Sequence, residues 1–118
     1  MTDEEIIAAF HAIWDNYPER AMLTQKSREI IAVNPQWAKR GVKPGTLCSE
    51  IGQPKNHKGC QCDRAADTAA PVGVAFEGHH GKGFKFWVPV EGRPDWIVHF
   101  AVGSSVSYPT AAKLAAEG

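Results

Sequence analysis

The sequence has no excess of positive or negative charge and no long apolar run, and each absence excludes a class of protein. It also has only three cysteines, an odd number that does not indicate a framework of disulfides. Thirteen Lys and Arg balance thirteen Asp and Glu, so a nucleic-acid partner is not expected. The longest apolar run, residues 96–102, is far shorter than the roughly 20 residues of a membrane helix. The N-terminus carries Asp3, Glu4 and Glu5, where a signal peptide would be basic. We therefore expect a cytoplasmic protein that binds no membrane.

The sequence also lacks the motifs of the common enzyme classes. It contains no G-x-S-x-G nucleophile motif and no H-E-x-x-H zinc motif. The glycines of residues 78–83 lie between two predicted strands rather than before a helix, so they do not indicate phosphate binding. We therefore expect that the protein is not an enzyme.

An amphipathic helix is predicted at the N-terminus, within residues 1–18. Thr2 and Glu5 have the spacing of a capping box, and Asn16 and Pro18 end the helix. The apolar stripe of this helix comprises Ile6, Ile7, Phe10, Ile13, Trp14 and Tyr17. Such a stripe needs an apolar partner. That partner is either the same domain or a second copy of the chain.

The rest of the sequence predicts two strands, several short helices and three further strands. The strands are expected at residues 21–25, 30–33, 71–77, 84–90 and 96–103. The helices are expected after Asn34-Pro35, within residues 46–52, over Asp63–Ala70 and over Pro109–Ala116. This order predicts an α+β fold with a five-stranded antiparallel sheet. The short helices cover one face, and a terminal helix or a second subunit covers the other.

Four stretches of this sequence match a known family in their order and spacing. The first is residues 28–35, where a strand ends at Asn34-Pro35, and the second is residues 41–51, which follow a G-K-x-C-x-E-x-F pattern. The third is residues 59–68, which contain Cys60 and Cys62, and the fourth is residues 88–102. Together they resemble the PAS domain, a small sensor module of bacterial signalling proteins, over roughly residues 20–104. Two features depart from the family pattern: the cysteine pair has one residue between its members instead of two, and Val102-Gly103-Ser104 replaces Asp-Ile-Thr.

The resemblance implies an organisation and a function. The N-terminal helix occupies residues 1–18, a PAS-like domain residues 19–104, and a C-terminal linker and helix residues 105–118. A small ligand or a change of redox state would alter how the helices pack, and a homodimer partner or a separate signalling protein would receive the signal. No kinase, cyclase or helix-turn-helix signature follows, so we expect a stand-alone module. A dimerisation module that binds no small ligand is an alternative.

Four potential metal ligands lie close together in the sequence: Cys48, His57, Cys60 and Cys62. Three cysteines and one histidine can bind structural zinc, and thiolates can hold an iron–sulfur cluster. Alternatively, Cys48 forms a redox-active pair with Cys60 or Cys62, or all three thiols are reduced and inert. Lys55 and Lys58 would lower the thiol pKa values and favour oxidation. A metal-binding protein on a PAS-like scaffold is therefore a second alternative function.

Aromatic residues are concentrated in the predicted sheet and in the helix that covers it. A small-ligand pocket is expected to be lined by Trp37, Phe76, Phe86, Trp87, Trp96 and His99. The alternative is that these rings fill the space as core. His99 interrupts the apolar last strand, as a buried neutral imidazole or as a contact to a ligand or haem. Covalent haem attachment is excluded because there is no Cys-x-x-Cys-His motif.

Overall fold

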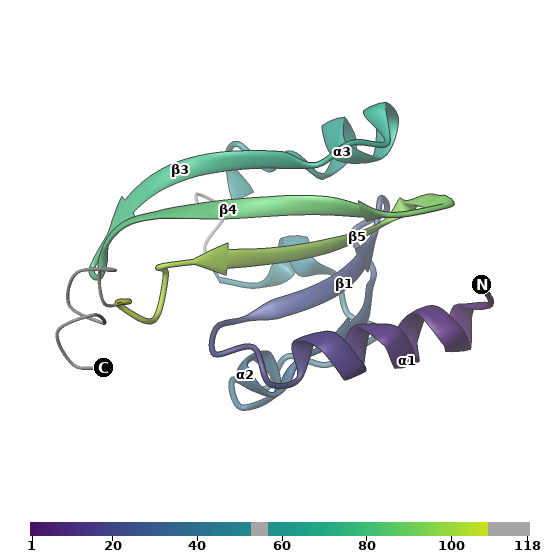
Figure 1. Cartoon of the computed structure of the whole chain (residues 1–118), viewed down its shortest axis with the longest axis horizontal. Coiled ribbons are helices and arrows are strands. Elements are labelled where there is room, and N and C mark those ends of the chain that lie inside the picture. Colours follow the sequence, from purple (N-terminus) through teal and green to yellow (C-terminus); the bar gives the residue numbers. More distant parts are fainter. Residues whose placement is uncertain (53–56, 109–118) are drawn as a thin grey trace, which may run out of the picture.

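The computed structural model describes residues 1–52 and 57–108, which form one antiparallel sheet with helices on both faces (Figure 1). The elements are α1 (Asp3–Trp14), β1 (Ala21–Gln25), β2 (Ile30–Val33), α2 (Pro35–Ala38), the 3₁₀ turn η1 (Cys48–Glu50), α3 (Cys62–Thr68), β3 (Val72–Gly78), β4 (Gly81–Val90) and β5 (Arg93–Val102). This confirms the α+β fold with a five-stranded antiparallel sheet. The predicted helix at Pro109–Ala116 lies outside the described residues. None of the described helices is both long and apolar enough to cross a membrane.

The strand order is β2-β1-β5-β4-β3, so β5, the last strand within the described residues, occupies the centre of the sheet. It pairs with β1 through Ala21↔Phe100 and with β4 through Trp87↔His99. Helix α1 packs on Trp96 and α3 packs on Ile97, so both faces of β5 are covered at these two residues, which explains why the strand is apolar on both faces there. The inner face carries Ile97 and His99 and faces α3 and η1; the outer face carries Trp96 and faces α1.

The two C-terminal hairpins are longer than the sequence suggested. Pairing of β3 with β4 continues to Gly78↔Gly81, so the turn is only His79-His80 and the predicted turn over residues 78–83 was wrong. Glycines are common in turns, but Gly83 lies within β4, opposite Phe76, and must be glycine because a Cβ there would overlap the Val102 carbonyl oxygen and lie 2.7 Å from the Phe76 ring. Similarly, β5 begins at Arg93 rather than residue 96, and α3 spans Cys62–Thr68 rather than residues 63–70.

Helix α1 packs on its own domain through the outer face of the sheet. The predicted capping box is present: Thr2 Oγ1 accepts from the Glu5 amide, and Glu5 Oε1 accepts from the Thr2 amide. Ile6 and Phe10 are buried against Leu23, Ala32 and Trp96. The helix ends at Trp14, before Tyr17, and Ile13 is 68% exposed. The apolar stripe is therefore only partly used within the domain.

A buried asparagine fixes the start of β1 to three other segments. Asn34 Oδ1 accepts from the amides of Ala21 and Trp37, at 3.1 and 3.4 Å. Its Nδ2 donates to the Glu19 carbonyl at 2.8 Å and to the Trp14 carbonyl at 3.2 Å. Because the side chain is fully buried, these bonds replace water and hold the ends of α1 and β2 and the start of α2 together.

Trp96→Ala tests the packing of α1 on the outer face. The indole is 4% exposed and sits among Ile6, Phe10 and Leu23, with the Arg93 guanidinium over its ring. We expect the free energy of unfolding to fall by about 3–5 kcal/mol, because the substitution leaves a cavity. Chemical denaturation measures it. Ile13→Ala, on the exposed side of α1, is the control and should change stability by less than about 0.5 kcal/mol; an equal loss in both variants would contradict this packing.

Candidate functional site

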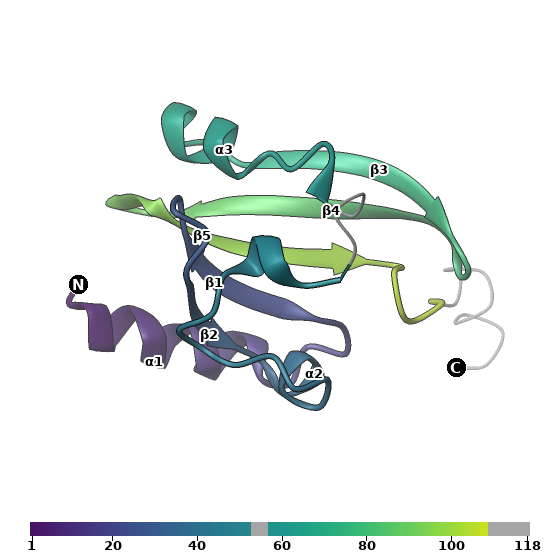
Figure 2. The same ribbon diagram turned by 180° about the vertical axis from the view of Figure 1, so that it is seen from behind.

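The inner face of the sheet is the candidate site, because α3 covers one end of it, over β4 and β5, and α2 and η1 cover the other end, near β1 and β2 (Figure 2). Two groups of side chains pack there. Cys62 and Ala65 of α3 pack on Trp87 and Ile97, with Cys60 and Val72 at the edge. Met22, Ile30 and Val33 pack against Trp37, Val42, Cys48 and Ile51. The layer between the sheet and the helices is thus filled by apolar and sulfur-containing side chains from both halves of the chain.

The six residues expected to line a ligand pocket do not share one space. Trp87, His99 and Phe76 lie on the inner face. Phe86 and Trp96 lie on the outer face, where Phe86 stacks on Phe100 at 5.2 Å and Trp96 packs on α1. Side chains alternate between the faces of a strand, and Phe86 and Trp87 are consecutive. Trp37 lies at α2 beneath the Arg20 guanidinium, 5.1 Å from the ring centre.

His99 is a neutral imidazole held in one orientation. Its Nδ1 lies 2.8 Å from the Phe86 carbonyl, which can only accept, so Nδ1 carries the proton and Nε2 keeps its lone pair. The ring stacks on Trp87, with centres 4.5 Å apart and planes at 12°. Burial lowers the pKa of His99 to about 4, against the opposing effect of the Phe86 carbonyl. Nε2 is therefore an acceptor for a hydrogen-bond donor or a metal.

His99 predicts a loss of stability in mild acid. Because its pKa is lower in the folded chain than in the unfolded chain, protons favour unfolding. The neutral His99 ring therefore makes its full contribution to stability above about pH 6.5. As the pH falls to 4, the free energy of unfolding should decrease by about 2–3 kcal/mol, a value that allows for residual solvent access. Denaturant titrations at pH 7, 6, 5 and 4 measure it. His99→Phe keeps a ring against Trp87 but does not titrate, so its stability should fall less over this range; parallel curves would contradict the assignment.

Cys48 and Cys62 lie near Arg28, and Cys60 packs in the same group as Cys62. Burial is the main cause of the raised pKa of Cys48, and burial raises the pKa of Cys62 to about 11 although Arg28 opposes it. Cys62 is 3% exposed, whereas Cys48 and Cys60 are half-buried.

Arg28 joins the elements that carry the thiols. Its φ is +81°, an uncommon conformation for a residue with a side chain. The guanidinium donates to the Lys26 carbonyl and, at 3.0 Å, to the Asp63 carboxylate at the start of α3. The Arg28 carbonyl accepts from the Cys48 amide at 2.8 Å. One residue of the β1–β2 turn therefore contacts both η1 and α3.

His57 is not directed at the cysteines as a ligand would be. Its Nε2 lies 2.6 Å from the Ile51 carbonyl, so this nitrogen donates a proton to the backbone. Over residues 1–52 and 57–108, no three His, Cys, Asp or Glu side chains are arranged to hold a metal ion. The sequence analysis placed Cys48, His57, Cys60 and Cys62 in one ligand set; in the structure Cys60 and Cys62 belong to one packed group and Cys48 to the other.

A fully buried carboxylate, which the sequence analysis missed, fixes the chain where it leaves the sheet. Glu19 Oε2 accepts from the Gly103 amide and the Tyr108 hydroxyl, both at 2.7 Å. Its Oε1 accepts from the Ser104 and Ser105 amides at 2.8 and 2.9 Å. Burial alone would raise the pKa of Glu19, but these bonds outweigh it and the pKa lies below its ordinary value. We call Glu19 with residues 103–108 the exit clamp.

Only one sequence signal pointed to the exit clamp. Glu19 is an acidic residue two positions before a buried apolar strand, where a charge needs partners. Its partners follow 84 to 89 residues later, so no local pattern identifies them. Gly103 is required there because its φ is +82° and a Cβ would lie 3.1 Å from the Lys82 carbonyl.

Glu19→Gln is expected to destabilise the chain by about 2–4 kcal/mol at pH 7, because a neutral amide cannot accept from all four groups. The lowered pKa means that the carboxylate stabilises the fold above about pH 4.5 and less as the pH falls. The difference between wild type and variant, measured by denaturation, should therefore shrink in acid. Tyr108→Phe removes one donor and should cost about 1 kcal/mol. A pH-independent difference would contradict this account.

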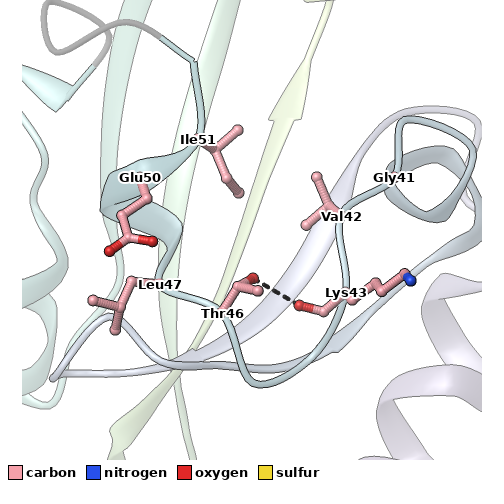
Figure 3. A pocket seen from close by; sticks show the side chains of 7 residues that line it. All are labelled: Gly41, Val42, Lys43, Thr46, Leu47, Glu50 and Ile51. Carbon is pink, nitrogen blue, oxygen red and sulfur yellow. Dashed lines mark hydrogen bonds between the residues drawn. The ribbon is translucent and has the colours of Figure 1, made fainter.

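A separate open pocket of about 260 Å³ lies between the loop after α2 and η1 (Figure 3). Val42 and Ile51 line it, and Thr46 Oγ1 donates to the Lys43 carbonyl at 2.8 Å. Its walls all come from residues 41–51, so neither His99 nor Trp87 reaches it. Through Val42 and Ile51 the pocket adjoins the second group of inner-face side chains, at the end of the site away from His99.

Comparison with solved structures identifies the fold. No family model and no curated protein matches the sequence. The structure of the PAS domain of BvgS from Bordetella pertussis superimposes with a TM-score of 0.64, at 15% identity, over 96% of this chain and 93% of that chain. The chain has the PAS fold. A sensory box sensor histidine kinase structure from Vibrio cholerae gives 0.59 at 10% identity, covering 86% of this chain and 92% of that one. The fold implied by the sequence resemblance is thus confirmed.

Proposed function

We propose that this chain is a sensory or regulatory domain that converts a change at the inner face into a change at the exit clamp. The PAS fold carries the proposal: one similar structure is a PAS domain, and another is described as a sensor histidine kinase. These names belong to those proteins, and the fold is what they share with this chain. The signal would be received by a second copy of the chain or by a separate signalling protein.

Two features of the inner face supply candidate inputs. His99 offers a lone pair on Nε2 beside the Trp87 ring, which suits a small molecule with a flat ring and a hydrogen-bond donor. The thiols of Cys48 and Cys60, near Arg28, offer a site that an oxidant can reach. A small ligand and a redox change would act on the same layer, between the sheet and α3.

Strand β5 supplies the route from input to output. It carries His99 on the inner face and leads directly into Gly103, whose amide is bonded to Glu19. Glu19 lies two residues before β1, which pairs with β5. A shift of β5 against β1 would therefore strain the exit clamp and free residues 103–108 to contact a partner.

A dimerisation-only function has less support. Ile6 and Phe10, the centre of the apolar stripe, are already buried against the sheet, which leaves Ile13 as its main exposed member. The metal-binding alternative has no support from the position of the His57 ring.

The first test is native mass spectrometry of the full chain purified under reducing conditions. A bound small molecule should add mass to the wild type and be absent from His99→Ala. Amide exchange at residues 103–108 should then differ between the loaded chain and the chain stripped of the molecule by unfolding and refolding. For the redox input, the same exchange is compared between the reduced chain and the chain treated with hydrogen peroxide.

Glu19→Gln is the control for the route, because it opens the exit clamp without touching the inner face. Exchange at residues 103–108 should be fast in this variant and insensitive to either input. The proposal is overturned if the wild type carries no small molecule and peroxide leaves its exchange at residues 103–108 unchanged.

A further inference from the structure

We propose that two copies of the chain pair edge to edge through β3, antiparallel and in one register, so that the sheet continues across a two-fold axis at Ala75. Strand β3 is one of the two edge strands of the sheet (Figure 1). The pairing does not depend on the proposed function, because it uses neither His99, nor the thiols, nor the exit clamp.

The two edges of the sheet differ in how their backbone groups are used. At the β2 edge, the Ile30 amide donates to the Thr46 carbonyl and the Ile30 carbonyl accepts from the Gly45 amide, both at 2.8 Å. The loop before η1 therefore covers that edge. Within residues 1–52 and 57–108, the backbone of β3 bonds to β4 and to no other segment. The free side of β3 is thus open to another strand.

The register of the β3–β4 hairpin determines which backbone groups point to the free side. Gly78 pairs with Gly81 across a two-residue turn, which brings the Gly78 carbonyl to the Gly81 amide, so this pair is hydrogen-bonded. Hydrogen-bonded and non-hydrogen-bonded pairs then alternate along the hairpin. The amides and carbonyls of Gly73, Ala75 and Glu77 therefore point away from β4.

Strand β3 lacks the features that protect an edge strand from pairing. Residues 72–76 carry no charge, and Val74 is 39% exposed. The pairing with β4 has no bulge, and Pro71 lies before the strand rather than within it. Charged side chains, bulges and prolines within the strand are the usual protection. An edge of seven residues without them is suited to pairing with another strand.

The sequence of β3 is self-complementary about Ala75. When two copies pair antiparallel with Ala75 opposite its own copy, Gly73 lies opposite the second copy's Glu77. All three outward-pointing residues then form hydrogen-bonded pairs, and each pair exchanges two bonds. Because each Glu77 faces a glycine, no like charges lie opposite each other. This match favours a second copy of the chain over an unrelated strand.

Moving the two-fold axis by one residue weakens the match. In one direction, Glu77 lies opposite Pro71, which has no amide hydrogen. In the other direction, the start of the strand lies opposite the β3–β4 turn. The axis at Ala75 pairs all seven residues of the strand, Val72–Gly78.

The side chains on both faces of the sheet fit this register. On the inner face, Val74 lies opposite the second copy's Phe76, and aromatic and β-branched side chains stabilise each other on neighbouring strands. On the outer face, the Phe86 ring covers Gly73, where a Cβ would lie 2.7 Å from the ring. The missing side chain at Gly73 leaves room for the second copy's Glu77.

Amide exchange followed residue by residue by NMR tests the pairing without a substitution. In a concentrated sample, the Gly73, Ala75 and Glu77 amides should exchange at least about tenfold more slowly than in a dilute one, because the second copy alone bonds them. Val74, whose amide bonds to β4 in the single chain, is the internal control and should change much less. Fast exchange of the three amides in the concentrated sample would overturn the proposal.

Substitutions at Ala75 test the axis. Its side chain is exposed, so Ala75→Lys and the matched control Ala75→Thr should both fold, which their melting temperatures check. Ala75→Lys places two like charges opposite each other and should raise the dissociation constant, measured by sedimentation equilibrium, at least about fivefold. Ala75→Thr should keep the dimer. Ala75→Pro removes an outward amide hydrogen but no bond to β4, and should weaken the dimer as Ala75→Lys does.

A cross-link tests the register. In Ala75→Cys, the two new thiols lie on the axis, with Cα atoms about 5.5 Å apart, which a disulfide can span. In Glu77→Cys, the corresponding Cα atoms are about 13 Å apart, too far for a disulfide. After incubation in a glutathione redox buffer, trypsin releases residues 65–82, which contain none of the native cysteines. This peptide should be joined to a second copy of itself in Ala75→Cys and remain single in Glu77→Cys.

Three further results would contradict the pairing. They are a dimer that Ala75→Lys leaves intact, a dimer that Ile13→Lys on the exposed side of α1 disrupts, and a link in Glu77→Cys as efficient as that in Ala75→Cys. None of them bears on the proposed function, which is tested by a bound small molecule and by amide exchange at residues 103–108. Either proposal can therefore fail while the other stands.

Discussion

The structure depends on how the polar groups around the start of β1 are satisfied away from water. Glu19 and Asn34 are both fully buried. Asn34 binds the backbone on the side of α1 and α2, and Glu19 binds the backbone where β5 ends. An unsatisfied buried carboxylate or amide would cost more than most apolar contacts return. These two side chains therefore define where the outer helix, the first strand and the last strand meet.

The sequence predicted the fold well because its signals are local. The capping box at Thr2, the β-branched run at residues 30–33 and the Asn34-Pro35 stop each act within a few residues, and all are present in the structure. It misplaced the hairpin turns because Gly83 looks like a loop residue until the Phe76 ring is placed over it. That contact arises only from cross-strand pairing, which a single sequence does not display.

The candidate site was harder to predict for the same reason. The cysteines were identified from their types and spacing, but Arg28, which bonds to both η1 and α3, lies in the β1–β2 turn, 20 residues before Cys48 and 34 before Cys62. Phe86 and Trp87 were assigned to one pocket, although consecutive strand residues face opposite sides. Side chains from distant segments meet because the strand order brings β1 next to β5, and that order is a property of the whole sheet.

The central position of β5 also determines when the domain can form. During synthesis, β1 and β2 are made early, but the strand that joins them to β4 and β3 follows all the other described strands. Until then, Met22 and Leu23 have no neighbour along that edge of the hairpin, and Glu19 lacks the amides of residues 103–105. Folding is therefore a late, single event dominated by long-range pairing. A chain truncated before β5 would expose an apolar hairpin edge, which is prone to aggregate.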